Sequence, residues 1–151
     1  MSPRFATLAL IVPALAGCEL EPDVGPAFAD RCTNADSDPA KSVSYTDDIV
    51  PLFFRDAAGC TPCHDPSQND GALGVQLGGL DLSTYQSLLR GGFNSTGSIV
   101  VPGRPCESVL FLKVSPGQPF GSRMPFNGPP FLTAPELRNV HDWIAEGAKE
   151  N

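Results

Sequence analysis

The chain has 151 residues, of which 41% are apolar and 18% charged, enough for one domain and hardly for two. Its 16 prolines and 15 glycines predict short, interrupted helices around a core that side chains alone would fill thinly. The formal net charge is −7, and eight of the 17 acidic residues lie between Glu19 and Asp48. The acidity therefore marks an N-terminal segment, and it does not favour nucleic-acid binding.

The first 17 residues have the layout of a secretory signal peptide. Arg4 precedes an apolar run over 6–15 that is too short to span a bilayer as a stable helix. The stretch LAGC, which ends at Cys18, resembles the lipobox of bacterial lipoproteins, and this implies that Cys18 is lipidated. The alternative is a plain secretory signal that ends in Gly-Cys by chance. We expect an exported protein, periplasmic or at the cell surface, anchored through lipid to a bacterial membrane, with the outer membrane preferred.

Residues 18–44 are rich in Asp, Pro, Ala and Ser and predict an acidic, flexible tether, so the folded domain is expected over 45–151. That domain begins with the first of about four short helices. Asp47 or Asp48 is expected to cap this helix, and its first turn tolerates Pro51 because the early N–H groups lack intrahelical partners. The helix leads directly into a cysteine motif.

The stretch GCTPCHDP places two cysteines three apart, with a histidine after the second. Thiol–disulfide exchange would require a preceding strand, whereas this motif follows a helix. Zinc would need four ligands, and downstream only Cys106 and His141 could add to the set, without a second pair spacing. Haem attachment needs two thiols for two vinyl groups and a histidine under the iron, which Cys60, Cys63 and His64 would supply. The haem interpretation is therefore favoured.

Two short helices are predicted after the motif. Ser83 is expected to cap the first, which Gly91 ends. Pro105 suits the first position of the second, whose apolar face would comprise Val109, Leu110 and Leu112.

The last helix is the clearest. Thr133 and Glu136 form a capping box, Pro135 lies near the start, and Gly147 stops the helix. Its apolar face comprises Leu137, Val140, Trp143 and Ile144. Because the loops between these helices are rich in Gly and Pro and lack strand alternation, we expect a small all-α fold.

Few residues of the chain could supply a sixth ligand to the iron. Beyond the signal peptide the chain has one methionine, Met124, in the segment GSRMPFNGPP, and one histidine besides His64. A rigid, Pro-rich loop can present a thioether to iron, so Met124 is the candidate, with a core-filling methionine as the alternative. His141, beside Asp142, is interpreted as a partly solvated surface residue rather than a ligand.

The chain has five cysteines, an odd number that indicates chemistry besides disulfides in an exported protein. If Cys18 carries lipid and Cys60 acts with Cys63, then Cys32 and Cys106 remain. An oxidising compartment favours a disulfide between these two, which would stabilise the fold by about 4 kcal/mol in the chain-entropy model. Two buried thiols that never meet are the alternative.

The segments CTPCH and RMP, followed by a terminal amphipathic helix, resemble a class I c-type cytochrome. Together with DIVPLF, GGLDLSTYQSLLRGG, IVVPGRPCESVLFLKV and ELRNVHDWIAEGA, they are similar to the planctomycete-type cytochrome c domain over 45–148. The resemblance implies thioether bonds at Cys60 and Cys63, His64 as proximal ligand and Met124 as distal ligand of one haem c. The insert DPSQNDGALGVQLGG departs from the family pattern, as does a cysteine at position 106, and leaves the exposed haem edge and the redox partner undetermined.

These features predict an exported, membrane-tethered monohaem cytochrome that carries one electron and is not an enzyme. It is expected to be a monomer whose redox partner proteins the sequence does not identify. The alternatives are a haem-based sensor or peroxidase-like enzyme with an open iron site, and a lipoprotein without haem whose cysteines are structural. Arg104 and Arg123 are considered as partners of a haem propionate, though a solvated charge is favoured for each. The expected apolar shell of the haem comprises Phe53, Phe54, Leu88, Leu110, Phe111, Val140 and Trp143.

Overall fold

The computed structural model of the chain describes residues 32–68, 72–118 and 120–151. Within these ranges the chain is helical without any strand, which confirms the all-α prediction. No helix in the described part is long and apolar enough to cross a membrane. The predicted signal peptide and Cys18 lie outside the described residues. The elements are a π-helical turn η1 (Tyr45–Ile49), α2 (Val50–Phe53), α3 (Thr61–His64), α4 (Leu73–Gly78), α5 (Tyr85–Arg90), a 3-10 turn η2 (Pro105–Glu107), α6 (Val109–Val114) and α7 (Ala134–Ala145).

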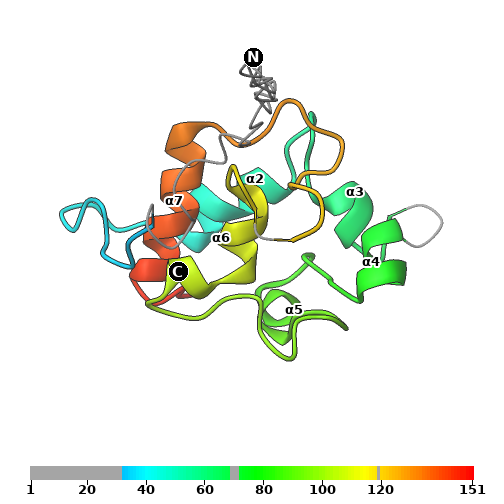
Figure 1. Cartoon of the computed structure of the whole chain (residues 1–151), viewed down its shortest axis with the longest axis horizontal. Helices are drawn as coiled ribbons and strands as arrows, with labels where there is room; N and C mark the ends of the chain where they lie inside the picture. Colours follow the sequence, from blue (N-terminus) through cyan, green and yellow to red (C-terminus); the bar gives the residue numbers. More distant parts are fainter. Residues whose placement is uncertain (1–31, 69–71, 119) are drawn as a thin grey trace, which may run out of the picture.

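Helix α7 is the longest element and begins as predicted. The Thr133 hydroxyl accepts a hydrogen bond from the Glu136 N–H, and the Glu136 carboxylate accepts one from the Thr133 N–H. The helix is followed by Gly147, whose φ of 103° requires glycine's freedom. Helix α7 packs against η1 and α6, while α3 and α4 lie toward the opposite end of the molecule (Figure 1).

The hydrophobic core gathers where α7 meets η1. Trp143 is only 1% exposed, and Ile144 and Ile49 are fully buried beside it. The Tyr45 ring lies 5.4 Å from the Trp143 ring and 5.1 Å from the Tyr85 ring, between centroids. Burial is the main cause that raises the pKa of Tyr45 to about 12, so this phenol stays neutral.

Two helix starts differ from the sequence prediction. The first cap is Ser44, whose hydroxyl accepts from the Asp47 N–H, while the Asp48 carboxylate reaches back to the Ser44 N–H at 2.9 Å. Neither aspartate is the cap, because the helical turn begins earlier, at Tyr45, and the Ser44 hydroxyl supplies the capping acceptor. Thr84 rather than Ser83 caps α5, and it does so within a reciprocal capping box.

The single helix predicted from Pro105 is two elements. Pro105 opens η2, but Ser108 then adopts an extended conformation with a ψ of 117°, and α6 starts at Val109. The Ser108 hydroxyl donates to the Arg104 carbonyl at 3.0 Å and accepts from the Val101 N–H at 2.9 Å. This buried hydroxyl therefore connects the break to the loop that precedes η2.

The sequence predicts a flexible tether over 18–44, but the structure docks residues 32–44 of it against α7. The Ser37 N–H donates to the Asp142 carboxylate at 3.0 Å, and the Val43 N–H donates to the Glu146 carboxylate at 3.0 Å. Composition alone suggested a solvated segment because the carboxylates that bind it lie more than 100 residues further along the chain. The folded unit therefore begins before residue 45.

Candidate functional site

The cysteine motif forms one helical turn that is tied to the preceding helix. The Cys60 carbonyl accepts from the Cys63 N–H at 3.1 Å and from the His64 N–H at 2.9 Å. Helical spacing places Cys60, Cys63 and His64 on neighbouring positions of one face. The Phe53 carbonyl anchors the turn, because it accepts from the Cys60 N–H at 2.8 Å and from the Thr61 hydroxyl at 3.3 Å.

The His64 ring is held by contacts that sequence reasoning did not identify. Its Nδ1 lies 3.0 Å from the Leu80 carbonyl, which can only accept, so Nδ1 carries a proton, and in the neutral ring Nε2 has the lone pair. A Cβ added at Gly74 would lie 2.5 Å from His64 Cε1 and 2.6 Å from the Cys63 carbonyl. Glycine at this position therefore lets α4 approach the ring, and the insert contributes to the site instead of looping away from it.

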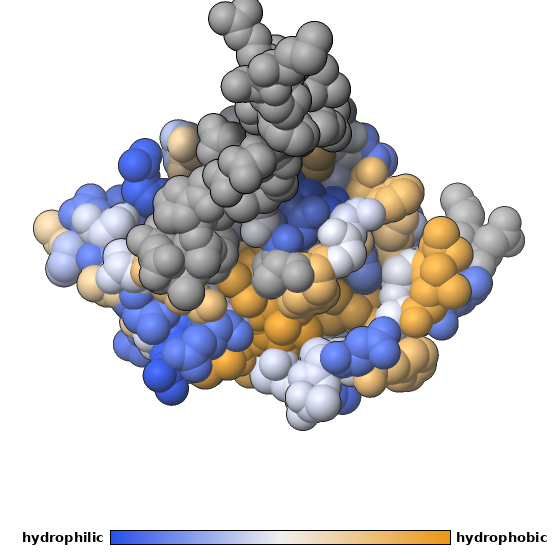
Figure 2. Space-filling view, in the orientation of Figure 1, coloured by the Kyte–Doolittle hydropathy of each residue, from blue (hydrophilic) through white to orange (hydrophobic). Residues whose placement is uncertain are grey.

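A cavity of about 600 Å³ lies beside the motif, and Cys60, Cys63, His64 and Met124 all line it. This volume is in the range of cofactor sites, about 300–1,000 Å³. In Figure 2 apolar side chains gather across the middle of the face and over α4. The apolar side chains that line the cavity include Leu73, Leu77, Leu82, Ile99, Leu110 and Phe126.

Part of the cavity wall is apolar and open to solvent. Leu77 is 72% exposed and Phe126 is 75% exposed, although both line the cavity. Exposed apolar surface of this kind marks a site where another group binds. A flat, apolar macrocycle that bonds to two cysteine sulfurs and takes nitrogen and thioether ligands suits this wall and this donor set, so the residues fit a haem.

Met124 reaches the cavity from the loop between α6 and α7, which is fixed to α6. The Met124 N–H donates to the Lys113 carbonyl at 2.8 Å. The Lys113 ammonium donates in turn to the carbonyls of Phe120 and Ser122, at 2.9 and 2.5 Å. Lys113 thus holds the loop twice: its side chain binds the segment before Met124, and its backbone carbonyl binds Met124 itself.

Arg55 connects three parts of the structure around the site, a role that sequence reasoning did not identify. Its guanidinium donates to the Glu136 carboxylate and to the Pro130 carbonyl, each at 3.0 Å. Its Nε donates to the Ala58 carbonyl at 3.4 Å. The loop before the motif, the loop after Met124 and helix α7 are therefore joined through one partly buried side chain.

The predicted apolar shell is largely wrong. Of its seven residues, Leu110 lines the cavity. Phe54 is 50% exposed, and Phe111 packs edge-on against His141 with centroids 5.2 Å apart. The remaining four, which belong to the core around α7, are Phe53, Leu88, Val140 and Trp143. Helical periodicity identified buried faces correctly but could not show which of them border the cavity.

The two arginines considered for a haem propionate have other partners. Arg104 forms an exposed ion pair with Glu107 at 2.8 Å, as expected for a solvated charge. Arg123 donates to the Val114 carbonyl at 2.9 Å, and its guanidinium lies 4.3 Å from the centre of the Phe131 ring. Arg123 is therefore part of the support of the methionine loop.

The alternative chemistries of the motif are not supported by its geometry. Burial raises the pKa of the Cys60 thiol to about 11, whereas disulfide exchange requires a thiolate that forms near neutral pH. Among the described residues, the cluster whose ligand atoms converge within 4.8 Å consists of Cys32, Cys106 and His141, not of residues in the motif. The side chains of Cys60, Cys63 and His64 instead line the cavity, where a macrocycle could bind.

Cys32 and Cys106 form a disulfide with their Cα atoms 5.8 Å apart. The interpretation of His141 as a partly solvated residue is wrong, because it is only 9% exposed. Its Nδ1 donates to the Asp142 carboxylate and its Nε2 to the Thr33 carbonyl, each at 2.7 Å. The partner Thr33 comes from the docked N-terminal segment, which the sequence could not place.

Residues 60–125 match the family model described as planctomycete cytochrome C. The matched range begins at Cys60 and ends directly after Met124, so it contains the two cysteines and the histidine of the motif, the cavity-lining helices α4 and α6, and Met124. No curated protein and no solved structure matches the chain. The matched family indicates a haem-binding electron carrier rather than a catalyst. The match bears out, over residues 60–125, the resemblance to the planctomycete-type cytochrome c domain that the sequence indicated.

Proposed function

We propose that the chain is an exported monohaem cytochrome that carries one electron, with haem c bound covalently at Cys60 and Cys63. His64 and Met124 would be the axial ligands of the iron. The observation that carries this proposal is that all four side chains line one cavity of about 600 Å³. Further support comes from the Leu80 carbonyl, which leaves His64 Nε2 as the free ligand atom.

When bound, the haem supplies an iron that changes its oxidation state by one electron, and a histidine–methionine ligand pair raises its reduction potential. The chain fixes the histidine tautomer, presents the thioether from a loop held on α6, and surrounds the site with apolar side chains. Two protein ligands would leave no iron position open to a substrate. Electron transfer is therefore favoured over the sensor or peroxidase-like alternative.

The proposal is tested first by a haem stain of the denatured protein, because only covalently attached haem remains on the chain. The optical spectrum of the ferric form should then show the charge-transfer band of methionine-ligated haem. Met124→Ala should keep the covalent haem, lose this band and lower the reduction potential. Phe126→Ala, a change in another cavity-lining side chain, should keep the band. Absence of covalent haem, or an unchanged band in Met124→Ala, would contradict the proposal.

The proposal includes a membrane anchor at Cys18, supported by the LAGC stretch that ends there. One acyl chain binds membranes weakly, whereas the two or three chains of a lipoprotein hold it firmly. The wild-type protein should fractionate with membranes, and Cys18→Ser should lose the lipid mass and the membrane association. A Cys18→Ser protein that still partitions with membranes would show that another feature holds it there.

A further inference from the structure

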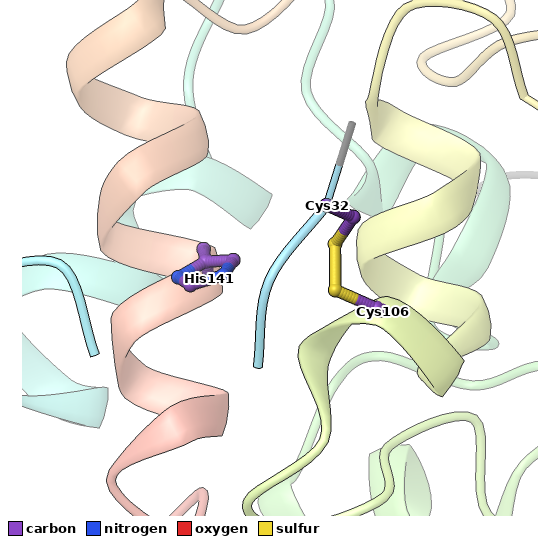
Figure 3. Close-up of side chains that lie close together, drawn as sticks. All are labelled: Cys32, Cys106 and His141. Atoms are coloured by element: carbon purple, nitrogen blue, oxygen red, sulfur yellow. A yellow bond between two sulfur atoms is a disulfide. The ribbon is translucent and has the colours of Figure 1, made fainter. Parts of the chain in front are cut away.

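Away from the cavity, three side chains with metal-binding atoms meet at the docked N-terminal segment (Figure 3). Cys32 belongs to that segment, Cys106 to η2 and His141 to α7. Their sulfur and nitrogen atoms all lie within 4.8 Å of one another. Because Zn–S bonds are about 2.3 Å long and Zn–N bonds about 2.0 Å, the ligands of one tetrahedral zinc ion lie about 3.3–3.8 Å apart. The two sulfur atoms are bonded to each other as a disulfide, so an ion could be surrounded only after this bond is reduced and the two sulfur atoms move apart.

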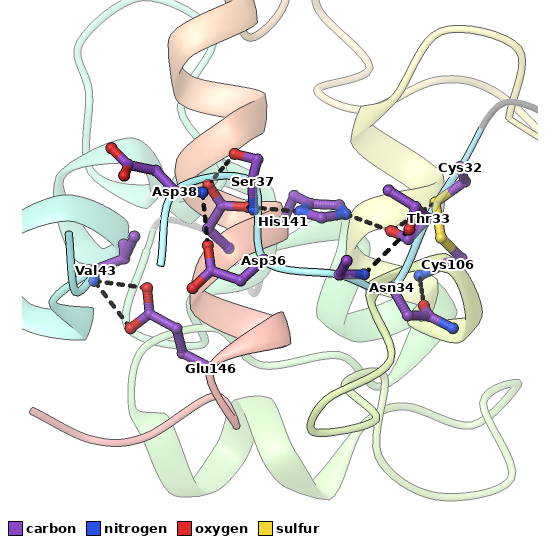
Figure 4. Close-up of polar contacts among 12 residues, drawn as sticks. Cys32, Thr33, Asn34, Asp36, Ser37, Asp38, Val43, Cys106, His141 and Glu146 are labelled. Atoms are coloured by element: carbon purple, nitrogen blue, oxygen red, sulfur yellow. Dashed lines mark hydrogen bonds and ion pairs between the residues drawn. A yellow bond between two sulfur atoms is a disulfide. The ribbon is translucent and has the colours of Figure 1, made fainter. Parts of the chain in front are cut away.

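His141 has the second partner that is typical of zinc-binding histidines. Its Nδ1 donates to the Asp142 carboxylate at 2.7 Å, and that carboxylate also accepts from the N–H and hydroxyl of Ser37 (Figure 4). A carboxylate on one ring nitrogen fixes the tautomer and directs the other nitrogen to the metal. The other nitrogen, Nε2, currently donates to the carbonyl of Thr33, the residue directly after Cys32. His141 Nε2 therefore already lies beside the part of the segment that carries Cys32.

A cleft of about 470 Å³ gives access to this cluster from solvent. Cys32 and His141 line the cleft, together with Phe111 and Ser115. An ion could enter here, and a water molecule could take the fourth position that three protein ligands leave open. Asp142 itself is buried and its oxygens are used by Ser37 and His141, so its role would be to orient the histidine.

We propose that Cys32, Cys106 and His141 bind one Zn²⁺ ion when the Cys32–Cys106 disulfide is reduced by a dithiol. The disulfide takes up two electrons and two protons from the dithiol, which leaves as its own disulfide. Zinc then displaces one proton from each thiol and the proton on His141 Nε2, all three passing to solvent, and Nε2 exchanges its hydrogen bond to Thr33 for the metal. The consequence is that the N-terminal segment stays fastened to η2 and α7 in both redox states. This proposal does not depend on the haem.

The test uses the full mature protein, reduced with a dithiol that is then removed without oxygen. One equivalent of Zn²⁺ is added, the thiols are alkylated, and peptide mapping reads each cysteine separately. Zinc should slow the alkylation of Cys32 and Cys106 at least about tenfold, because a metal-bound thiolate is a poor nucleophile. Native mass spectrometry should show one zinc on the reduced chain and none on the oxidised chain. Because each cysteine is mapped, thiols at the haem motif cannot be mistaken for this site.

Three variants decide whether the geometry is responsible. His141→Ala should abolish the protection, and Asp142→Asn should require about 10–100-fold more zinc. Glu146→Gln is the matched control, since this carboxylate also fastens the N-terminal segment but does not contact His141. Equal alkylation with and without zinc, full protection in His141→Ala, or a loss in Glu146→Gln as large as in Asp142→Asn would overturn the proposal. So would a reduced chain that unfolds and does not refold with zinc.

Discussion

The two ends of the molecule are stabilised in different ways. Around α7 and η1, large side chains such as Trp143 and Ile144 are buried among one another. Around the cavity, Leu77 and Phe126 remain exposed, and the helices that carry the site have only four to six residues. Isolated helices of this length are not stable in water. The α7 end can therefore fold on its own packing, whereas the cavity end depends on loop contacts and on the group that fills it.

The largest expected effect comes from comparing the loss of one aromatic side chain at each end. Trp143→Ala removes a buried ring and should destabilise the fold by about 3–5 kcal/mol. Phe126→Ala should cost less than about 0.5 kcal/mol in haem-free protein, because its ring is exposed. Urea unfolding followed by circular dichroism measures both. Similar losses in the two variants would show that the cavity end is packed as firmly as the α7 end.

A second prediction concerns two glycines of the same helix at the cavity end. Gly74→Ala should cost about 1–3 kcal/mol and disturb the spectrum of the bound haem, because its Cβ would overlap the His64 ring. Gly78→Ala is the matched control, since no atom lies within 4 Å of a Cβ there. This control should gain up to about 1 kcal/mol from helix propensity. Equal spectra for the two variants would mean that α4 does not press on the histidine.

The sequence predicted the α7 end better than the cavity end, for physical reasons. The Thr133 capping box and the apolar period of α7 are local signals, and the structure confirms them. Helices α3 and α4 are too short to show a period, so neither was predicted. Met124 was identified from residue chemistry, but Arg55, which braces its loop, was missed because its partners are remote in sequence.

A third prediction concerns Arg55, whose contacts connect the two ends. Arg55→Gln loses the ion pair with Glu136 and the bond to the Pro130 carbonyl, and should cost about 1 kcal/mol. Because Pro130 belongs to the loop that presents Met124, the methionine charge-transfer band should also disappear at a lower temperature than in wild type. Arg104→Gln is the control, since its exposed pair with Glu107 should contribute less than about 0.5 kcal/mol. A band equally stable in both variants would argue that the loop is held without Arg55.

The smallest effect is the acid sensitivity of the α7 end, where Asp142 fastens the N-terminal segment. Burial raises the pKa of this carboxyl, but hydrogen bonds from Ser37 and His141 more than offset it, so the pKa lies below its ordinary value. The stabilisation is thus complete above the unfolded pKa, about 3.9, and is lost as the pH falls through the folded one. The stability difference between wild type and Asp142→Asn should therefore be full at neutral pH and shrink below about pH 4. Urea titrations at several pH values measure it, with the exposed Asp38→Asn as control, and a difference that stays constant with pH would show that the contacts of Asp142 do not favour its charged form.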